Sequence, residues 1–198
     1  MTTERASSRR TRTGLLDSAL TCLAESGYAG LSLRAVADHA GVPVSQIHYH
    51  FGGKEGLLLA VLEYRNAQLL ERQRTMYRGA EPLWKKWQRA CDYLEADLAS
   101  GYVRVLQELI AVGWSDETVA AAVRAELAGW VELLTSAAQK AVDALDIPGI
   151  EPRQVAILVG AAFLGAEELE LLGLGDSVDV RGALRAIGGL IRMAEGDL

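Results

Sequence analysis

The sequence has few cysteines, few prolines and no long hydrophobic run. Its two cysteines, Cys22 and Cys91, stand far apart and outside any Cys/His ligand spacing. This excludes a disulfide scaffold and a cysteine metal site, and it predicts buried thiols in a reducing cytoplasm. The longest apolar stretch, residues 155–166, is too short to cross a bilayer, and residues 1–13 are polar and arginine-rich. We therefore expect a cytoplasmic protein with neither a secretion signal nor a membrane span.

Charge is distributed unevenly along the 198 residues, whose net charge is −6. The segment through Glu55 carries a net charge of +1 and all three histidines, whereas the remainder carries −7. An acidic total argues against nonspecific coating of a polyanion. It still permits a local basic face that binds nucleic acid.

Helical periodicity runs from one end of the chain to the other, without the alternation typical of strands. It predicts an all-α protein of about nine helices, several of them bounded by glycine or proline. The expected helices span residues 10–26, 33–40, 44–50, 54–79, 83–98, 103–110, 119–145, 152–174 and 180–191. A break is expected at residues 147–149. The pattern predicts a small domain over residues 1–53 and a larger one over residues 54–198, linked by the helix that begins at residue 54.

Two of the short helices, residues 33–40 and 44–50, flank a glycine-containing turn and have the length of a helix-turn-helix. Ser32 can cap the first of them. In the second, Ile47 and Phe51 lie one turn apart and face inward. The outward positions are then Ser45, Gln46, His48 and Tyr49. Hydroxyl, amide and imidazole groups on one exposed face suit base edges and phosphates in a DNA major groove, so the pattern predicts a recognition helix.

Roughly the first 60 residues resemble the tetracycline-repressor-like (TetR) family of bacterial transcriptional regulators. The likeness is carried by three spaced segments, ALTCLAESGY, LSLRAVADHAGV and IHYHFGGKEGL. It implies that residues 1–53 form a DNA-binding domain with a basic N-terminal arm. It further implies that residues 54–198 bind an effector and form a dimer.

The resemblance implies a DNA-binding role for individual residues, by position in the motif. The residues in base-reading positions are Val44, Ser45, Gln46 and His48, and those in phosphate-contacting positions are Tyr49, His50 and Lys54. Arg34 would contact a base or a phosphate, and Ser32 would cap its helix beside the DNA backbone. The arm could add minor-groove or backbone contacts from Arg9, Arg10 and Arg12. Lys54 also opens a helix, where free N–H groups favour a phosphate. Three residues depart from the family pattern. Pro43 and Gly53 replace capping side chains, and His48 replaces a tyrosine.

Other chemistry has little support in the sequence. His48 and His50 stand two apart on a helix, so their side chains point about 200° apart and cannot chelate one ion from one face. A merely solvated surface is the alternative to DNA contact for these side chains. The sequence holds no nucleophile elbow, phosphate loop or HExxH pair. We expect no metal, no cofactor and no enzymatic activity.

All four tryptophans lie in the larger predicted domain. Aromatic residues at helical spacing are either core residues or the lining of a small-molecule site between helices. The predicted effector site comprises Trp84, Trp87, Trp114, Glu126 and Trp130. Glu126 lies on an apolar stripe, where an unpaired carboxylate would be costly. A carboxylate among tryptophans favours a cationic aromatic effector, and the alternative is that the tryptophans are core.

The helix expected over residues 152–174 is apolar nearly all round in its first half and must be covered on all sides. We therefore expect a homodimer through the last two helices, where Gly160, Gly165, Gly188 and Gly189 would allow close approach. The alternative is a monomer in which this helix is central and buried.

Together these patterns predict a repressor that binds an inverted-repeat operator in double-stranded DNA as a dimer. A small molecule bound in the larger domain would release it through reciprocal coupling between the two sites. Two alternatives remain at this point. One is a DNA-binding regulator without an effector, and the other is a small-molecule-binding helical bundle whose DNA reader has decayed.

Overall fold

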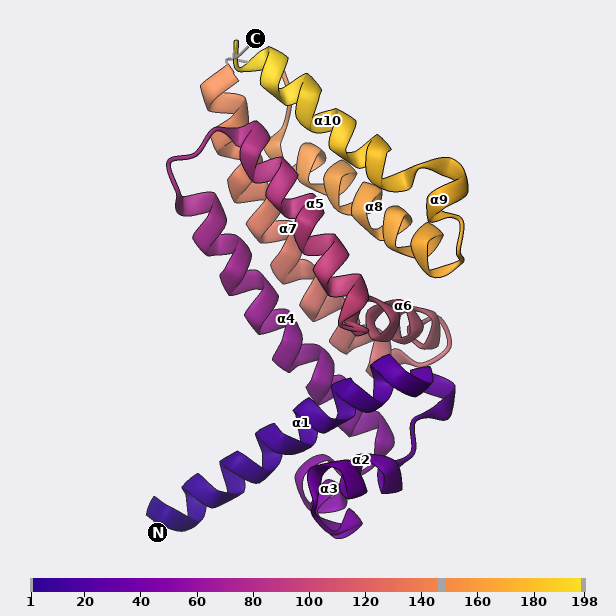
Figure 1. The fold of residues 1–198 in the computed structure, drawn as a ribbon. Coiled ribbons are helices and arrows are strands. Elements are labelled where there is room, and N and C mark those ends of the chain that lie inside the picture. The colour runs from indigo at the N-terminus through magenta and orange to yellow at the C-terminus, as the bar shows by residue number, and fades with distance from the viewer. Residues whose placement is uncertain (1, 146–148, 197–198) are drawn as a thin grey trace. The chain divides into compact units, whose positions relative to one another are not determined.

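The computed structural model of the protein describes residues 2–145 and 149–196, and every regular element within these two segments is a helix (Figure 1). The helices are α1 (Thr2–Gly30), α2 (Leu33–Ala40), α3 (Val44–Phe51), α4 (Lys54–Arg78), α5 (Leu83–Ala99), α6 (Tyr102–Gly113), α7 (Glu117–Leu145), α8 (Pro152–Leu171), α9 (Gly175–Val178) and α10 (Val180–Ala194). The all-α prediction is confirmed. The element missed by the sequence is α9, a single turn too short to show apolar periodicity. Of the break expected at residues 147–149, only Gly149 lies within the described residues.

Short polar and glycine residues set the ends of α2 and α3, as the sequence predicts. The Oγ atom of Ser32 accepts a hydrogen bond from the backbone N–H of Ala35 at 3.1 Å and so caps α2. Gly41 ends α2 and Gly52 ends α3, both at positive φ, which side chains disfavour. Pro43 precedes α3 without providing a side-chain cap. Local sequence therefore fixes three of the four ends of these two helices.

Helix α1 is longer than the periodicity predicts. It begins at Thr2 rather than near Arg10, so the segment expected as a basic arm is helical in the structure. Residues 2–9 contain neither glycine nor proline, and helix propensity allows the extension. The sequence predicts that this helix ends at Gly27. In the structure Gly27 has a non-helical backbone, with φ 67° and ψ 179°, and α1 ends three residues later, at Gly30.

Packing divides the chain into two compact units. The first comprises residues 1–67 and 97–123, and the second comprises residues 68–96 and 124–198. Helices α4, α5 and α7 each continue from one unit into the other. This division does not coincide with the expected boundary after residue 53, because α1 packs on α6 as well as on α2. The extent of the functional domains stays a prediction.

The core of the first unit joins the apolar faces of α1, α2, α3 and α6 to the first part of α4. Side chains buried there include Leu16, Val36, Ile47, Leu58 and Leu109. Helix α2 packs on α1, and α3 packs on α2 (Figure 1). The position of α3 therefore depends on this shared core rather than on its own eight residues.

In the second unit, α10 lies beside α8 and is hydrogen-bonded to α5 (Figure 1). The carboxylate of Glu195 accepts the backbone N–H of Leu83 at 2.8 Å and so caps the start of α5. Further along, the guanidinium of Arg185 donates to carboxylates of Asp92 and Glu95, each at 2.7 Å. Because the end of α10 meets the start of α5, the two helices run antiparallel.

Large apolar side chains of α8 and α10 are exposed on the single chain. Leu158 is 72% exposed and Leu190 is 67% exposed. Ile157, Leu169, Leu172 and Met193 are exposed as well. Helix α8 is therefore not a central helix buried within one chain, and the monomer alternative is wrong on this point. No helix in the described residues has both the length and the hydropathy of a membrane span.

Candidate functional site

Helix α2, the turn at residues 41–43 and helix α3 form the predicted helix-turn-helix. In the turn, the N–H of Val42 donates to the carbonyl of Ala37 at 3.0 Å and closes the end of α2. The N–H of Gln46 donates to the carbonyl of Pro43 at 2.9 Å and starts α3. Ile47 is fully buried and anchors α3 in the core of the first unit.

The opposite face of α3 is open to solvent. Tyr49 is 76% exposed, Ser45 and His48 are exposed, and Val44, Gln46 and His50 are half-buried. The side chains that the sequence predicts to face outward therefore reach the surface. Their hydroxyl, amide, imidazole and phenol groups can hydrogen-bond to base edges and to phosphate oxygens.

Aromatic rings at the end of α3 meet an arginine of α1. The rings of Tyr49 and His50 meet edge-on at 4.9 Å between centroids, and those of His50 and Phe51 lie 5.9 Å apart. The guanidinium of Arg12 lies 5.3 Å from the centroid of the Phe51 ring. A cation over an aromatic face is attracted by the ring quadrupole. Arg12, expected only as an arm residue, thus helps to hold α1 against the end of α3.

The residues predicted to bind phosphate lie close to two helix N-termini. Ser32 precedes α2 and Lys54 opens α4, and a helix N-terminus favours an anion. Arg34 follows in the first turn of α2. Its side chain is 88% exposed and lies 3.9 Å from the carboxylate of Asp38. Exposed pairs of this kind are readily replaced by water or by another anion.

Gly56 belongs to this site although the sequence reasoning overlooked it. It lies in the first turn of α4, where a Cβ atom would collide with the backbone carbonyl oxygen of Phe51. Glycine at this position lets α4 begin directly against the end of α3. A glycine inside a helix is unfavourable by about 1 kcal/mol relative to alanine. Its presence near the start of a long helix was the signal that could have revealed this contact.

The three histidines have separate surroundings. The Nδ1 atom of His39 lies 3.0 Å from the hydroxyl of Ser18, and that of His48 lies 3.3 Å from the carbonyl oxygen of Gly52. His50 packs between the rings beside it. In the part of the chain that the structure describes, no group of three or more His, Cys, Asp or Glu side chains is placed to hold a metal ion.

The predicted effector residues are split between the two units. Trp114 belongs to the first unit, follows α6 and is 83% exposed. The other four, Trp84, Trp87, Glu126 and Trp130, belong to the second unit. Glu126 and Trp130 are half-buried on α7. The structure therefore does not gather all five around one pocket within a unit.

The side chain of Trp87 lies in the contact between α5 and α10. It is 8% exposed, its indole N–H donates to the carbonyl of Leu184 at 2.7 Å, and its ring lies 5.6 Å from that of Phe163 on α8. This arrangement fits the alternative that this tryptophan is a core residue. The role of the remaining predicted residues in effector binding stays a prediction.

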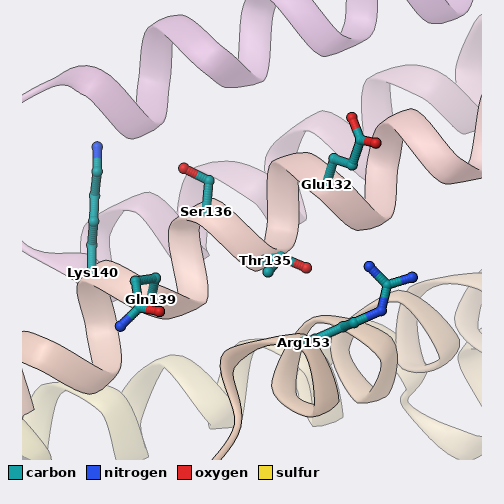
Figure 2. A pocket seen from close by; sticks show the side chains of 6 residues that line it. All are labelled: Glu132, Thr135, Ser136, Gln139, Lys140 and Arg153. Carbon is teal, nitrogen blue, oxygen red and sulfur yellow. The ribbon is translucent and has the colours of Figure 1, made fainter.

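An open hollow of about 400 Å³ lies between α7 and the start of α8 (Figure 2). Its lining residues are Glu132, Thr135, Ser136, Gln139, Lys140 and Arg153. Five of them follow one another at helical spacing on α7, and Arg153 extends toward them from α8 (Figure 2). None belongs to the predicted aromatic set. The lining side chains include two cations and one carboxylate, although the surface that they expose to the hollow is mostly apolar.

Residues 15–61 match the family described as bacterial regulatory proteins of the tetR family. The match to the TetR family is confined to this segment. The matched segment holds the predicted DNA-contacting residues from Ser32 to Lys54, as well as Gly56, but not the three arginines predicted as the arm.

The likeness to TetR-family proteins is confined to one segment in sequence, whereas the likeness in fold extends along the chain. The HTH-type transcriptional repressor AcnR of Corynebacterium glutamicum is 37% identical over 60 residues, which cover 30% of this chain and 32% of that repressor. The match thus spans about a third of the repressor's length. A TetR-family regulator of Pectobacterium atrosepticum is 25% identical, with a TM-score of 0.74 and 96% of each chain covered. FadR of Bacillus subtilis, solved in complex with stearoyl-CoA, shares the fold, with 16% identity, a TM-score of 0.73, and 90% of this chain and 96% of that chain covered.

Proposed function

We propose that this TetR-family chain is a DNA-binding transcriptional repressor that reads its operator with α3. The observation that carries the proposal is the contrast between buried Ile47 and the open polar face with Ser45, His48 and Tyr49. The buried anchor fixes the helix, and the polar face is left for base edges. AcnR, which matches this segment, is named a transcriptional repressor, and this supports repression as the outcome.

Contacts to the DNA backbone would position α3 in the groove. The residues proposed for this role are Ser32, Arg34, Tyr49, His50 and Lys54, and Arg9 and Arg10 are exposed on the first part of α1. Backbone contacts set the register of a reading helix but carry no sequence information themselves. Base contacts are proposed for Val44, Ser45, Gln46 and His48.

The active form is proposed to be a homodimer joined through α8 and α10. The exposed side chains of Leu158 and Leu190 belong to an apolar surface that a second copy of the chain would cover. Two-fold symmetry would place two α3 helices roughly 34–36 Å apart, one turn of DNA. The operator would then be an inverted repeat.

A small molecule bound in the second unit is proposed to control DNA binding. A ligand that favours a dimer with another spacing of its α3 helices must weaken DNA binding by the same factor by which DNA weakens ligand binding. Helix α4 is continuous between the units and would carry the change. Two places are candidates: the half-buried Glu126 and Trp130 on α7, and the hollow beside Arg153. A ligand complex is recorded for FadR, which shares this fold.

No catalytic step is part of this function, and the regulator would act in the cytoplasm, where bacterial DNA lies. The experiment that tests DNA binding is selection of duplexes from a random library with the full chain. The enriched duplex and a shuffled duplex are then titrated by fluorescence anisotropy at two salt concentrations. We expect an inverted repeat, bound at least about a thousandfold more tightly than the shuffled duplex. We also expect an affinity that falls as salt rises.

A substitution on α3 and a matched substitution far from α3 distinguish a loss of base recognition from an effect on the protein as a whole. We expect Ser45→Ala to weaken selective binding, whereas Ser177→Ala, the same exchange at an exposed position of α9, leaves it unchanged. If the wild-type chain enriches no sequence, the proposal of a DNA-binding regulator is wrong, and the alternative with a decayed reader gains support.

The effector proposal has its own test, release of the fluorescent operator by compounds from a small-molecule library. The variants Trp130→Ala and Arg153→Ala separate the two candidate places. Loss of release with intact operator binding in one variant identifies the site. A response that survives both exchanges contradicts both placements. If no compound releases the wild-type chain, the alternative of a regulator without an effector is favoured.

A further inference from the structure

His48 and Gly52 are joined by two hydrogen bonds at the end of α3. The backbone N–H of Gly52 donates to the carbonyl of His48 at 3.0 Å, and the Nδ1 atom of His48 lies 3.3 Å from the carbonyl oxygen of Gly52. Gly52 has φ 77° and ends α3 in the left-handed region. The ring of His48 is therefore tied to the end of its own helix, although the residue is exposed.

This contact decides which ring nitrogen carries the hydrogen. A carbonyl oxygen can only accept, so the bond to Gly52 requires an N–H at Nδ1. In a neutral imidazole the second nitrogen then has no hydrogen and presents a lone pair. The Nε2 atom of His48 is thus an acceptor on the face of α3 proposed to meet DNA.

We infer that His48 reads DNA as a hydrogen-bond acceptor and selects a base with an exocyclic amino group in the major groove. Such groups are N6 of adenine and N4 of cytosine. Guanine presents the acceptors N7 and O6 at the same edge, and thymine presents O4, so neither can pair with a lone pair on Nε2. This inference rests on the proposed function, because it requires α3 to enter the groove.

The neighbouring polar side chains on α3 lack this restriction. The hydroxyls of Ser45 and Tyr49 can each donate or accept, and the amide of Gln46 carries both kinds of group. Among these four side chains of α3, that of His48 is the one whose outward atom, Nε2, can only accept a hydrogen bond. It is therefore the side chain from which the structure gives a base preference.

The first test measures the tautomer directly on the full-length protein without DNA. Long-range proton–nitrogen NMR spectra of the nitrogen-labelled protein, at about pH 8 to favour neutral imidazole, distinguish a hydrogen on Nδ1 from one on Nε2. Spectra of His39→Gln, His48→Gln and His50→Gln assign the three rings. We expect the hydrogen of His48 on Nδ1. A hydrogen on Nε2 would overturn the inference.

The second test uses the library selection with wild-type chain, His48→Arg and a matched control, His39→Arg. Arginine prefers guanine, so we expect one position of each half-site to change from adenine or cytosine to guanine with His48→Arg alone. Placing guanine at that position should weaken wild-type binding about tenfold. His39→Arg adds the same charge on α2 and should leave the selected sequence unchanged.

The outcomes of the selection separate this inference from the proposed function. An enriched operator whose sequence is the same for wild type and His48→Arg overturns the inference and leaves the regulator intact. Selection of guanine by the wild-type chain as the base that His48 contacts also overturns the inference. A wild-type chain that enriches no sequence contradicts the proposed function and removes the DNA-reading role of His48 with it.

Discussion

The indole N–H of Trp87 donates a 2.7 Å hydrogen bond to the main-chain carbonyl of Leu184, and both side chains are buried. The two residues belong to α5 and α10, far apart in the sequence. The bond holds α10, which is proposed for dimerisation, to α5 within the second unit.

Loss of this bond should destabilise the second unit. We expect Trp87→Phe, which keeps an aromatic ring beside Phe163, to lower the free energy of unfolding by about 1 kcal/mol. Trp87→Ala, which leaves a cavity, should lower it by about 3–5 kcal/mol. Urea unfolding followed by circular dichroism measures both. The control is Trp114→Phe at an exposed site, expected within about 0.5 kcal/mol of wild type. Equal effects of the two phenylalanine variants would show that the Trp87 bond contributes nothing.

Gly56 should be required for the position of α3. A Cβ atom at Gly56 collides with the backbone carbonyl oxygen of Phe51, and backbone cannot move aside as a flexible side chain can. We expect Gly56→Ala to lower stability by about 1–3 kcal/mol and to weaken operator binding. Gly53 has open space around it, and Gly53→Ser should change stability by only a few tenths of a kcal/mol. Unfolding and DNA titrations of both variants check this, and a Gly56→Ala protein that behaves like wild type would contradict it.

Stability should fall at alkaline pH through the thiol of Cys91. Burial raises the pKa of this thiol from 9.0 to about 11. The native state then holds the proton more tightly than the unfolded state does. The stabilisation is complete below about pH 9 and is lost as the pH rises through 11. We expect the free energy of unfolding to fall less steeply between these pH values in Cys91→Ala than in wild type. The same steepness in both proteins would show that Cys91 does not titrate as described.

Charges placed on the exposed apolar surface should separate the proposed dimer. Leu158→Glu on α8 and Leu190→Glu on α10 would each bury an unpaired carboxylate between two copies of the chain. We expect the dissociation constant of the dimer to rise by roughly a hundredfold or more. Ala128→Glu adds the same charge at an exposed position of α7 and serves as the control. Sedimentation velocity distinguishes the two states, and variants that remain dimeric would place the interface elsewhere.

Lys54 and Ser45 should affect DNA binding in different ways. A phosphate contact releases counterions, so Lys54→Gln should reduce the steepness of log affinity against log salt by about 0.9 per contact. Its loss of affinity should be similar for all duplexes. Ser45→Ala should leave the salt dependence unchanged and relax the preference at one base pair. Titrations at four salt concentrations, on operator and shuffled duplexes, separate the two roles. Identical salt dependence in Lys54→Gln and wild type would exclude the phosphate contact.

Much of the fold and of the DNA-binding surface could be predicted because the signals are local. Ser32 caps a helix through a hydrogen bond three residues away, and Gly41 and Gly52 end helices through their own φ angles. The inward position of Ile47 follows from spacing within one helix. The effector region was harder to predict, because a tryptophan at helical spacing looks alike whether it lines a pocket or fills a core.

The sequence by itself determined the helices, their caps and the polar outer face of α3, since each depends on residues within about one helical turn. Tertiary structure alone decided that Trp87 binds α10, that Gly56 meets Phe51 and that Arg12 lies over the Phe51 ring. It also decided that the apolar side chains of α8 and α10 stay uncovered within one chain. The physical reason is that each of these depends on how separate helices pack, and periodicity within a helix shows which face is apolar but not which partner covers it.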